Sequence, residues 1–377
     1  MILFNKKLTI VAVAIASVFS SSTFAFENAN QQQDASSAIS VGKFSGKFSG
    51  NFRLGYVSTE DNNGDSVESS AIGGELSYSS ASWNGISATG SLYTTQKLFN
   101  DDNGDFFASD GDSYAILGQA YLQANVGATE VKVGRFGFDS PHADMDDIRM
   151  VPNTFSGILV TNNDLSDTTV YLAHLDKWSG VDSDKPEDFT DMNNSDGVNV
   201  FGAVYDGIEN VALQSWYYNI NDLADLIYLE AMVEVEQFSI GVQYAKQSDN
   251  SDDNTGPDGD VYGITASYTL NDFTFSSAYN HVSGTIINGF GGGPFFSNAE
   301  DHTIDGVIDQ KALRVGIDYS GIDNVTIGLA HVDFDEGEDE TDLLISYDFG
   351  NDMAFDFTYH HMHDDGDMVL AMFNIGF

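Results

Sequence analysis

Four aspartates and one arginine are crowded into one short stretch of the chain. They are Asp139, Asp144, Asp146, Asp147 and Arg149. Carboxylates held in a confined space can bind a hard cation such as calcium, and they can create an electric field that orients a charged solute. The same stretch carries the apolar residues Ile148, Met150, Val151 and Phe155. An exposed loop gains nothing from such an apolar run, so we expect segment 138–155 to dock against a wall with its charges facing a narrow space.

The sequence around this stretch repeats a rhythm of alternating segments, each about ten residues long. In the clearest segment, Phe52, Leu54 and Tyr56 alternate with Asn51 and Arg53. Successive side chains of a β-strand point to opposite faces, so the pattern predicts strands with one apolar and one polar side. About eighteen segments follow the rhythm: 44–57, 70–81, 86–97, 113–126, 129–137, 156–162, 168–178, 197–206, 209–219, 224–236, 238–248, 260–270, 273–283, 310–320, 324–334, 341–349, 353–362 and 367–377.

The connections between these segments alternate in length. Short turns are expected at 83–85, 127–129, 236–237, 271–272 and 350–352, and long acidic loops at 58–69, 98–112, 138–155, 179–196, 248–259 and 284–309. Short turns at one end and long loops at the other are typical of transmembrane barrels. We therefore predict an all-β fold, a transmembrane antiparallel β-barrel of about 18 strands with an inward-folded third outer loop. A barrel of this size leaves an aqueous channel.

The start of the chain has the features of a signal peptide over residues 1–25. Lys6 and Lys7 precede a short apolar run, and Thr23-Phe24-Ala25 supplies the small residues of a cleavage site. Residues 26–41 are expected to form an N-terminal linker, and 42–377 the transmembrane barrel. No later apolar run approaches the roughly 20 residues that a spanning helix needs. These features predict a multi-pass β-barrel in a bacterial outer membrane.

The last predicted strand ends the chain on an aromatic residue. Its apolar positions alternate, at Val369, Ala371, Phe373, Ile375 and Phe377. This ending is typical of bacterial outer-membrane barrels. We expect Phe377 to serve as the C-terminal signal for the barrel assembly machinery.

The composition excludes several classes of protein. The formal net charge is −44, which argues against binding to nucleic acid and favours cations near the protein. There is no cysteine, so disulfides and thiol chemistry are excluded. The 27 phenylalanines and 17 tyrosines exclude an acidic disordered chain, because such chains lack aromatic residues.

The alternation also places charged residues on the inside of the barrel. The predicted wall residues are Lys47, Arg53, Lys132, Glu230, Glu234 and Arg314. Glu230 and Glu234, for example, alternate with Leu229, Ala231 and Val233, which are expected to face lipid. Acidic and basic groups on opposite sides of a narrow channel create a transverse field that orients polar solutes. The alternative is that each group is an ordinary solvated charge.

A stretch of about 25 residues resembles a known family. It reads Gly134-Arg135, then Asp139-Ser140-Pro141, then Asp-Asp-Ile-Arg-Met-Val-Pro-Asn-Thr-Phe from Asp146, with Gly157 after it. This is similar to the constriction-loop region of the outer membrane porin D (OprD-like) family of Gram-negative bacteria. The resemblance implies an eighteen-stranded channel for small nutrients, with inward-folded loops and a ladder of basic wall residues opposite acidic loop groups. The chain departs from that pattern, because only four arginines and eight lysines follow the signal peptide.

Calcium binding is a further hypothesis. Asp61–Asp65 and Asp101–Asp105 resemble fragments of calcium loops, but neither has the closing glutamate, so turns stabilised by Asn-Gly are the favoured interpretation. Asp144, Asp146 and Asp147 are the better calcium candidates, because a constriction would concentrate them.

Three histidines near the C-terminus suggest a transition-metal site. His360 faces oppositely to His361 and His363 on a strand, so at most two of them can converge. Histidines at the membrane interface or at the rim of the barrel are therefore the favoured interpretation.

These features favour a passive diffusion channel for small hydrophilic solutes and ions, with a preference for cations. The alternative is a structural or adhesive barrel whose acidic loops bind calcium, and an outer-membrane hydrolase ranks last because no spacing marks a nucleophile and its base. No cofactor is implied apart from possible calcium. The apolar outer face would serve outer-membrane lipid or a neighbouring subunit of a homotrimer equally well.

Overall fold

A computed structural model describes residues 38–41, 44–99, 106–252, 255–337, 339–363 and 365–377. The predicted signal peptide, 1–25, and most of the predicted linker lie outside the described residues. The last four residues of that linker form a short strand, β1 (Ala38–Val41), which pairs with β2. The described residues contain no helix long and apolar enough to cross a membrane.

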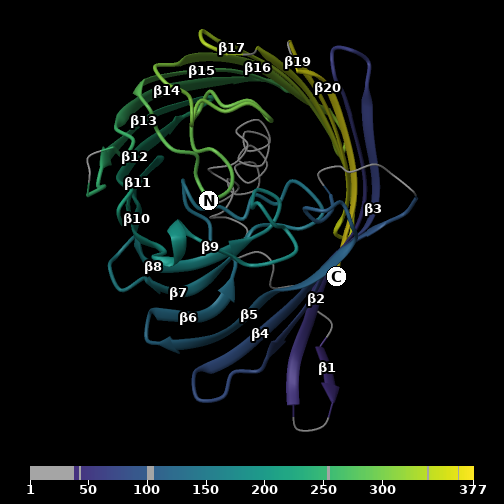
Figure 1. Cartoon of the computed structure of the whole chain (residues 1–377), viewed down its shortest axis with the longest axis vertical. Coiled ribbons are helices and arrows are strands. Elements are labelled where there is room, and N and C mark those ends of the chain that lie inside the picture. Colours follow the sequence, from purple (N-terminus) through teal and green to yellow (C-terminus); the bar gives the residue numbers. More distant parts are fainter. Residues whose placement is uncertain (1–37, 42–43, 100–105, 253–254, 338, 364) are drawn as a thin grey trace, which may run out of the picture.

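The chain forms a closed antiparallel β-barrel (Figure 1). The sheet has twenty strands, of which β1 and the two-residue β9 (Thr190–Asp191) are appendages, so eighteen close the barrel. Closure comes from β20 pairing with β2, from Gly376 opposite Asn51 to Asp367 opposite Glu60. The barrel strands are β2 Phe44–Glu60, β3 Ser66–Ser80, β4 Ile86–Lys97, β5 Tyr114–Val126, β6 Thr129–Phe136, β7 Thr154–Asn162, β8 Thr168–Ser179, β10 Val198–Ile208, β11 Val211–Ile220, β12 Ala224–Val235, β13 Phe238–Asp249, β14 Gly259–Leu270, β15 Phe273–Gly284, β16 Lys311–Ile322, β17 Val325–Phe334, β18 Glu340–Gly350, β19 Met353–Met362 and β20 Gly366–Gly376.

The predicted all-β barrel of eighteen strands is confirmed, with strand bounds that differ by at most four residues. The largest differences fall at the first hairpin, where β2 and β3 continue through most of the predicted loop 58–69. Pairing from Val57–Ser69 to Glu60–Ser66 leaves only residues 61–65 to make the turn. The backbone N–H and C=O groups of β2 and β3 hydrogen-bond to each other here. The strands can therefore continue past the residues that carry the alternating apolar pattern.

Side chains alternate between the two faces of the strands as expected. On β2, Phe52, Leu54 and Tyr56 are exposed, whereas Arg53 is only 7% exposed. Exposed apolar side chains recur in this way around the barrel, for example Leu313 and Val315 on β16. Such a band is what the hydrocarbon interior of a membrane requires.

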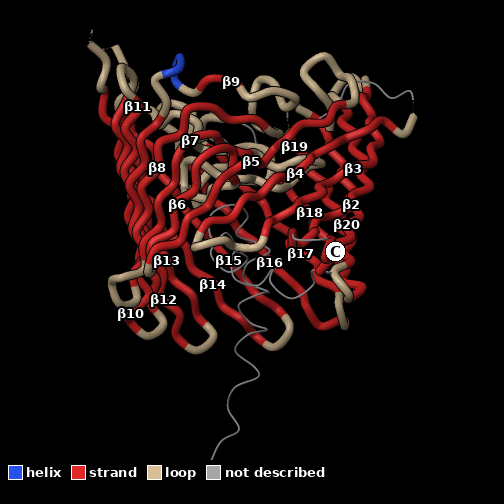
Figure 2. The backbone as a smooth tube through the Cα atoms, turned by 90° about the horizontal axis from the view of Figure 1, so that it is seen from below, coloured by secondary structure: helices blue, strands red, loops and turns tan. Residues whose placement is uncertain are grey.

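The connections are unequal at the two ends of the barrel (Figure 2). One end has tight turns such as Asn84-Gly85, where both residues have positive φ (51° and 83°), as a two-residue hairpin turn demands. The other end carries long segments, above all 137–153 between β6 and β7 and 285–310 between β15 and β16. These two segments supply most of the candidate site.

The buried sides of the strands are apolar over large areas. One cluster includes Trp216, Tyr218 and Tyr228 of β11 and β12 together with loop residues such as Phe138 and Phe295. A second cluster packs Met150, Val151, Phe106 and Phe189 against β2, β3 and β20. The long segments are therefore held by apolar packing as well as by polar contacts.

Candidate functional site

Segment 137–153 is anchored by the apolar residues that follow its aspartates. Met150 and Val151 are buried, and a side chain at Gly55 of β2 would collide with the sulfur of Met150. The expected docking of this run therefore holds for Met150, Val151 and the β7 residue Phe155. Ile148 was expected to dock as well, but it is 40% exposed and lines a cavity.

An ion pair with β2 fixes the acidic end of the segment. The guanidinium of Arg53 donates to both carboxylate oxygens of Asp147, at 2.6 and 2.5 Å, and to the backbone carbonyl of Arg149 at 2.7 Å. Fork-shaped contacts of this kind set both distance and orientation. Arg53 therefore holds the backbone on both sides of Ile148.

An aromatic box holds the other end of the segment. The His142 ring meets Tyr218, Tyr228 and Phe295 edge to face, with centroids 5.4 to 5.8 Å apart. Its backbone N–H donates to the Tyr218 hydroxyl at 3.1 Å. Complete burial lowers the pKa of His142 to about 3, so the imidazole is neutral and serves as an apolar anchor.

Segment 285–310 packs beside segment 137–153 and is also hydrogen-bonded to the barrel wall. Phe290 forms a β-bridge with Ala143. The backbone N–H of Asp144 donates to the carbonyl of Phe290, and the N–H of Phe290 donates to the carbonyl of His142. Arg314 of β16 donates to the carbonyl of Asn298. The two long segments thus behave as one packed unit.

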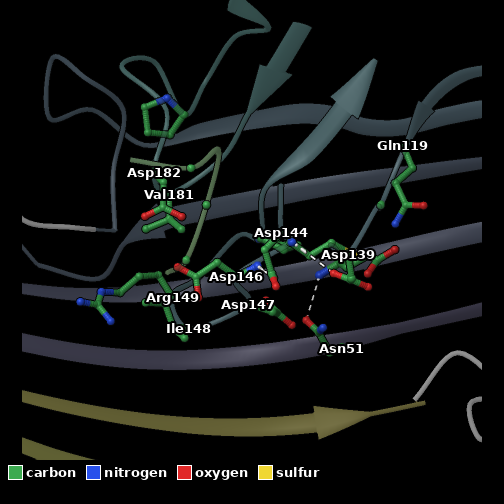
Figure 3. Close-up of a pocket in the computed structure, with 18 of the residues that line it drawn as sticks. Asn51, Gln119, Asp139, Asp144, Asp146, Asp147, Ile148, Arg149, Val181 and Asp182 are labelled. Carbon is green, nitrogen blue, oxygen red and sulfur yellow. Dashed lines mark hydrogen bonds between the residues drawn. The ribbon is translucent and has the colours of Figure 1, made fainter. Parts of the chain in front are cut away.

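A cavity of about 1300 Å³ lies beside these segments (Figure 3). Among the described residues its lining holds nine acidic side chains and two basic ones. The acidic residues are Glu75, Asp139, Asp144, Asp146, Asp147, Asp182, Glu300, Asp301 and Asp305, and the basic ones are Lys132 and Arg149. Figure 3 shows Asp139, Asp144, Asp146 and Asp147 grouped together, with Arg149 extending away from them. The cavity is therefore strongly acidic.

Crowding changes the protonation of these carboxyl groups. Burial, followed by the charges of Asp139 and Asp182, raises the pKa of Asp144 to about 8. Burial and the neighbouring Asp182 raise the pKa of Asp146 to about 8, and burial raises that of Asp139 to about 6. A nearby cation stabilises the charged form of each carboxyl group, because it offsets the cost of desolvation and the repulsion between neighbouring carboxylates.

The predicted constriction residues Asp139, Asp144, Asp146, Asp147 and Arg149 all line the cavity. Of the predicted wall residues, only Lys132 does so, 3.2 Å from Glu130 and beside the Tyr121 ring. The other wall residues lie elsewhere: Lys47 and Glu234 are exposed outside the cavity lining, and Arg53, Glu230 and Arg314 are buried.

Glu230 shows why side-chain alternation alone did not locate the cavity lining. Its carboxylate accepts hydrogen bonds from Gln214 at 2.8 Å and from Tyr228 at 2.5 Å. The Tyr228 hydroxyl lies 3.4 Å from the carbonyl of Pro294, so segment 285–310 covers this part of the wall. A side chain can thus be on the expected face of a strand and still be sealed from the cavity.

The three aspartates predicted to bind calcium do not form a three-ligand group in the described part of the chain. Both oxygens of Asp147 accept from Arg53, so a cation at Asp144 and Asp146 would have to share Asp147 with that guanidinium. In the first hairpin, Asp61 accepts from the backbone N–H groups of Asn63 and Asp65, both at 2.9 Å, as the turn interpretation expects. The other fragment, 101–105, lies outside the described residues.

Five acidic lining residues were not singled out from the sequence: Glu75, Asp182, Glu300, Asp301 and Asp305. Glu75 could have been found by its alternation with Leu76 of β3, which is exposed. The other four lie in long acidic loops, where no spacing distinguishes a lining residue from a solvated one.

Residues 88–299, more than half of the chain, match the family described as outer membrane porin, OprD family. The chain belongs to the OprD family of outer membrane porins. None of the curated proteins matches the chain. The predicted family resemblance, the outer-membrane location and the absence of an enzymatic role are thereby confirmed.

Solved structures of this family share the fold. Pseudomonas aeruginosa OccK8 (OprE) aligns with a TM-score of 0.77 at 17% identity, covering 88% of this chain and 98% of that one. Pseudomonas aeruginosa OpdK with vanillate gives 0.75 at 18%, and a BenF-like porin from Pseudomonas fluorescens Pf-5 gives 0.77 at 15%, both with the same coverage. Members of this family are channels for small substrates, which confirms the coarser part of the functional prediction.

Proposed function

We propose that this OprD-family porin is a passive diffusion channel that prefers cations and cationic or zwitterionic solutes. The observation that carries the proposal is the lining of the cavity, in which nine carboxyl groups face two basic groups. A low-dielectric cavity with charges of one sign concentrates the opposite ion and repels like charges.

We infer that segment 137–153 forms the constriction. Arg53 fixes it near Asp147, and the aromatic box fixes it at His142, so the carboxyl groups between these anchors cannot move away from the cavity. A filter has to be rigid, because a loose loop would let its charges move away from a passing solute.

Solutes with both charges are the best fit to this arrangement. An ammonium or guanidinium group can approach Asp144, Asp146 and Asp182, while Lys132 offers a contact for a carboxylate. Arg149 is a weaker contact for an anion, because its side chain is buried against Met368. A solute with only negative charge meets mostly carboxyl groups and is expected to pass slowly.

The test is the reversal potential of the refolded chain in a planar bilayer with a salt gradient across it, at pH 9, where Asp144 is ionised. Cation selectivity that falls when Asp144 and Asp182 are changed together to asparagine would support both the function and the filter. The matched control replaces Asp167 and Asp323, which lie in turns outside the cavity lining, in the same way. Anion selectivity in the unmodified channel would overturn the proposal.

The other predicted partners follow from the same function. We propose that the apolar outer band contacts outer-membrane lipid and that Phe377 is read by the barrel assembly machinery. Phe377 continues the closing ladder, since its N–H donates to the carbonyl of Gly50 at 3.0 Å. A homotrimer and binding of calcium stay predictions.

A further inference from the structure

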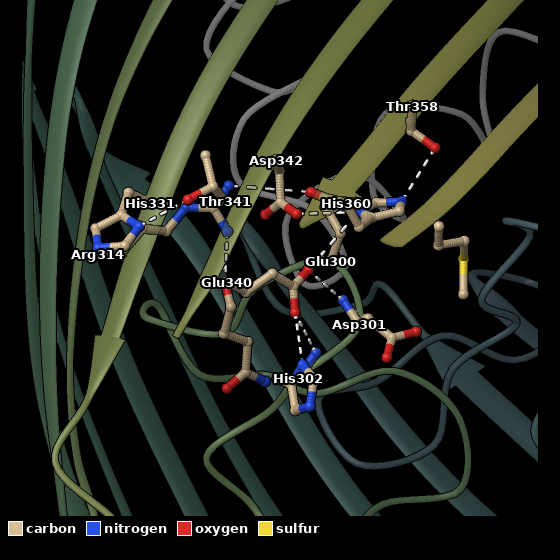
Figure 4. A network of polar contacts seen from close by, with 12 residues as sticks. Glu300, Asp301, His302, Arg314, His331, Glu340, Thr341, Asp342, Thr358 and His360 are labelled. Carbon is tan, nitrogen blue, oxygen red and sulfur yellow. Dashed lines mark hydrogen bonds and ion pairs between the residues drawn. The ribbon is translucent and has the colours of Figure 1, made fainter. Parts of the chain in front are cut away.

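Three ionisable side chains converge on the barrel wall away from the acidic cluster of segment 137–153. Glu340 and Asp342 of β18 and His360 of β19 each offer a ligand atom, and these atoms lie within 4.8 Å of one another. Their exposed fractions are 0%, 0% and 4%. Figure 4 shows Asp342 and His360 pointing toward each other, with Asp301 and His302 of segment 285–310 close by.

The distances show that one imidazole nitrogen faces both carboxylates. His360 Nδ1 lies 2.9 Å from Asp342 Oδ1 and 3.6 Å from Glu340 Oε1. The other nitrogen, Nε2, lies 3.1 Å from the Thr358 hydroxyl, which fixes the ring orientation. A second-shell hydrogen bond of this kind is the usual way in which a ligating histidine is held.

A second observation concerns the other oxygen of Asp342. Oδ2 of Asp342 is buried and has no hydrogen-bond partner among the described residues. Leaving one oxygen of a buried carboxylate without a partner is expensive, and buried charges are normally paired or bound to a metal. The imidazole of His302 lies 2.9 Å from Glu340 Oε2, and that of His360 lies 2.9 Å from Asp342 Oδ1, so neither of them reaches Oδ2 of Asp342.

We propose that Glu340, Asp342 and His360 bind a divalent transition-metal ion of the zinc type. One nitrogen and two or more carboxylate oxygens are a ligand set that zinc accepts, whereas calcium and magnesium take oxygen ligands. Glu300 of segment 285–310 lies outside this ligand group, because its Oε1 faces the guanidinium of Arg314 at 3.9 Å.

The site would fasten a pore-lining loop to the wall. Glu340 already accepts hydrogen bonds from the backbone N–H groups of Asp301 and His302, at 3.0 and 2.8 Å. Glu300 and Asp301 line the cavity. A metal ion on Glu340 therefore joins β18 and β19 to the part of segment 285–310 that shapes the cavity, and it acts on structure without taking part in selectivity.

The experiment is isothermal titration calorimetry of the refolded full-length barrel with zinc chloride as the only titrant, in a buffer whose sodium and calcium chloride occupy the surface carboxylates. We expect one saturable site per chain and a higher unfolding temperature with zinc. Asp342→Asn and His360→Gln are each expected to weaken zinc binding by at least about tenfold. His361→Gln is the matched control, because His361 is exposed on the same strand. Binding that is unchanged in both ligand variants would overturn the proposal.

If a ligand variant fails to fold, the site can still be tested on the unmodified protein. Cobalt(II) added to the wild-type barrel should give a saturable visible absorption spectrum at one equivalent, and zinc should displace it. No saturable spectrum, together with no zinc-dependent rise in unfolding temperature, would overturn the site. Neither outcome bears on cation selectivity, which is measured by reversal potential, so failure here is distinct from failure of the proposed function.

Discussion

Arg53 and Asp147 are 94 positions apart in sequence, yet they form a two-pronged ion pair at 2.6 and 2.5 Å. The arginine belongs to the first barrel strand and the aspartate to the segment between β6 and β7. The pair is asymmetric, because the Arg53 side chain is 8% exposed whereas that of Asp147 is 45% exposed. Arg53 is therefore the fixed partner and the acidic segment is the part that it positions.

Replacing Arg53 should loosen segment 137–153, the proposed constriction. Arg53→Gln removes the fork, and we expect the segment to lose about 1–2 kcal/mol of local stability, because Asp147 can regain hydration. Single-channel recordings should show a higher mean conductance and more open-channel noise. Arg135→Gln is the control, since Arg135 is also an arginine but lies outside the cavity lining, beside the Phe189 ring. Unchanged conductance and noise in Arg53→Gln would show that the segment is held without the pair.

Cation selectivity should rise with pH. The pKa values of Asp144 and Asp146 are raised to about 8, so both groups are largely protonated and neutral at pH 6. Raising the pH through 8 removes these protons and adds negative charge to the cavity. Reversal potentials measured from pH 6 to pH 9.5 should therefore shift toward the value of an ideally cation-selective channel. The Asp144→Asn, Asp146→Asn double variant should lose most of this shift, and a shift of the same size in the variant would contradict the assignment.

Lys132 should oppose cation flow. Lys132→Gln removes one of two basic groups in the lining, and we expect the cation-to-anion permeability ratio to rise roughly two- to fivefold, the factor given by about 0.4–1 kcal/mol of Coulomb energy. Lys47→Gln is the matched control, because Lys47 is exposed outside the cavity lining. An equal change in both variants would mean that the effect comes from net charge and not from position.

The imidazole of His142 should be replaceable by an apolar ring. Its two ring nitrogens are buried without hydrogen-bond partners among the described residues. His142→Phe keeps the aromatic contacts and is expected to leave the unfolding temperature unchanged or to stabilise the barrel by about 1 kcal/mol. His142→Ala should destabilise it by about 3 kcal/mol, through the space left behind. Strong destabilisation by His142→Phe would indicate that the ring nitrogens bind something.

Solute uptake should follow charge. In liposome-swelling assays, arginine and glycine should enter faster than vanillate, because the cavity has many more acidic than basic groups. The differences between these entry rates should become smaller in high salt, where charges are screened. Faster entry of vanillate would contradict the cation preference.

Local pattern was enough to predict the barrel. Strand alternation and turn residues act over a few positions, so Phe52, Leu54 and Tyr56 identify an outward face without any knowledge of the neighbouring strands. The acidic segment was also recognisable, because its aspartates and its apolar run are adjacent in sequence. Met150 and Val151 dock as expected, whereas Ile148 faces the cavity.

What is close in space but distant in sequence could not be predicted in the same way. The histidines near the C-terminus are expected as interface or rim residues, but their own stretch does not indicate that His360 is buried with Glu340 and Asp342 of the neighbouring strand. Their meeting depends on the register of β18 against β19, where Asp342 lies opposite His360. Register is a property of the assembled sheet.

The sequence by itself determined the strands, their apolar outward faces, the asymmetry of the connections and the acidic character of the channel. Only the tertiary structure decided which charges line the cavity. Glu230 and Arg314 lie on the expected side of their strands, but segment 285–310 packs over them and seals them from it. The physical reason is that a strand pattern fixes the direction of a side chain, whereas packed loops decide what that side chain meets.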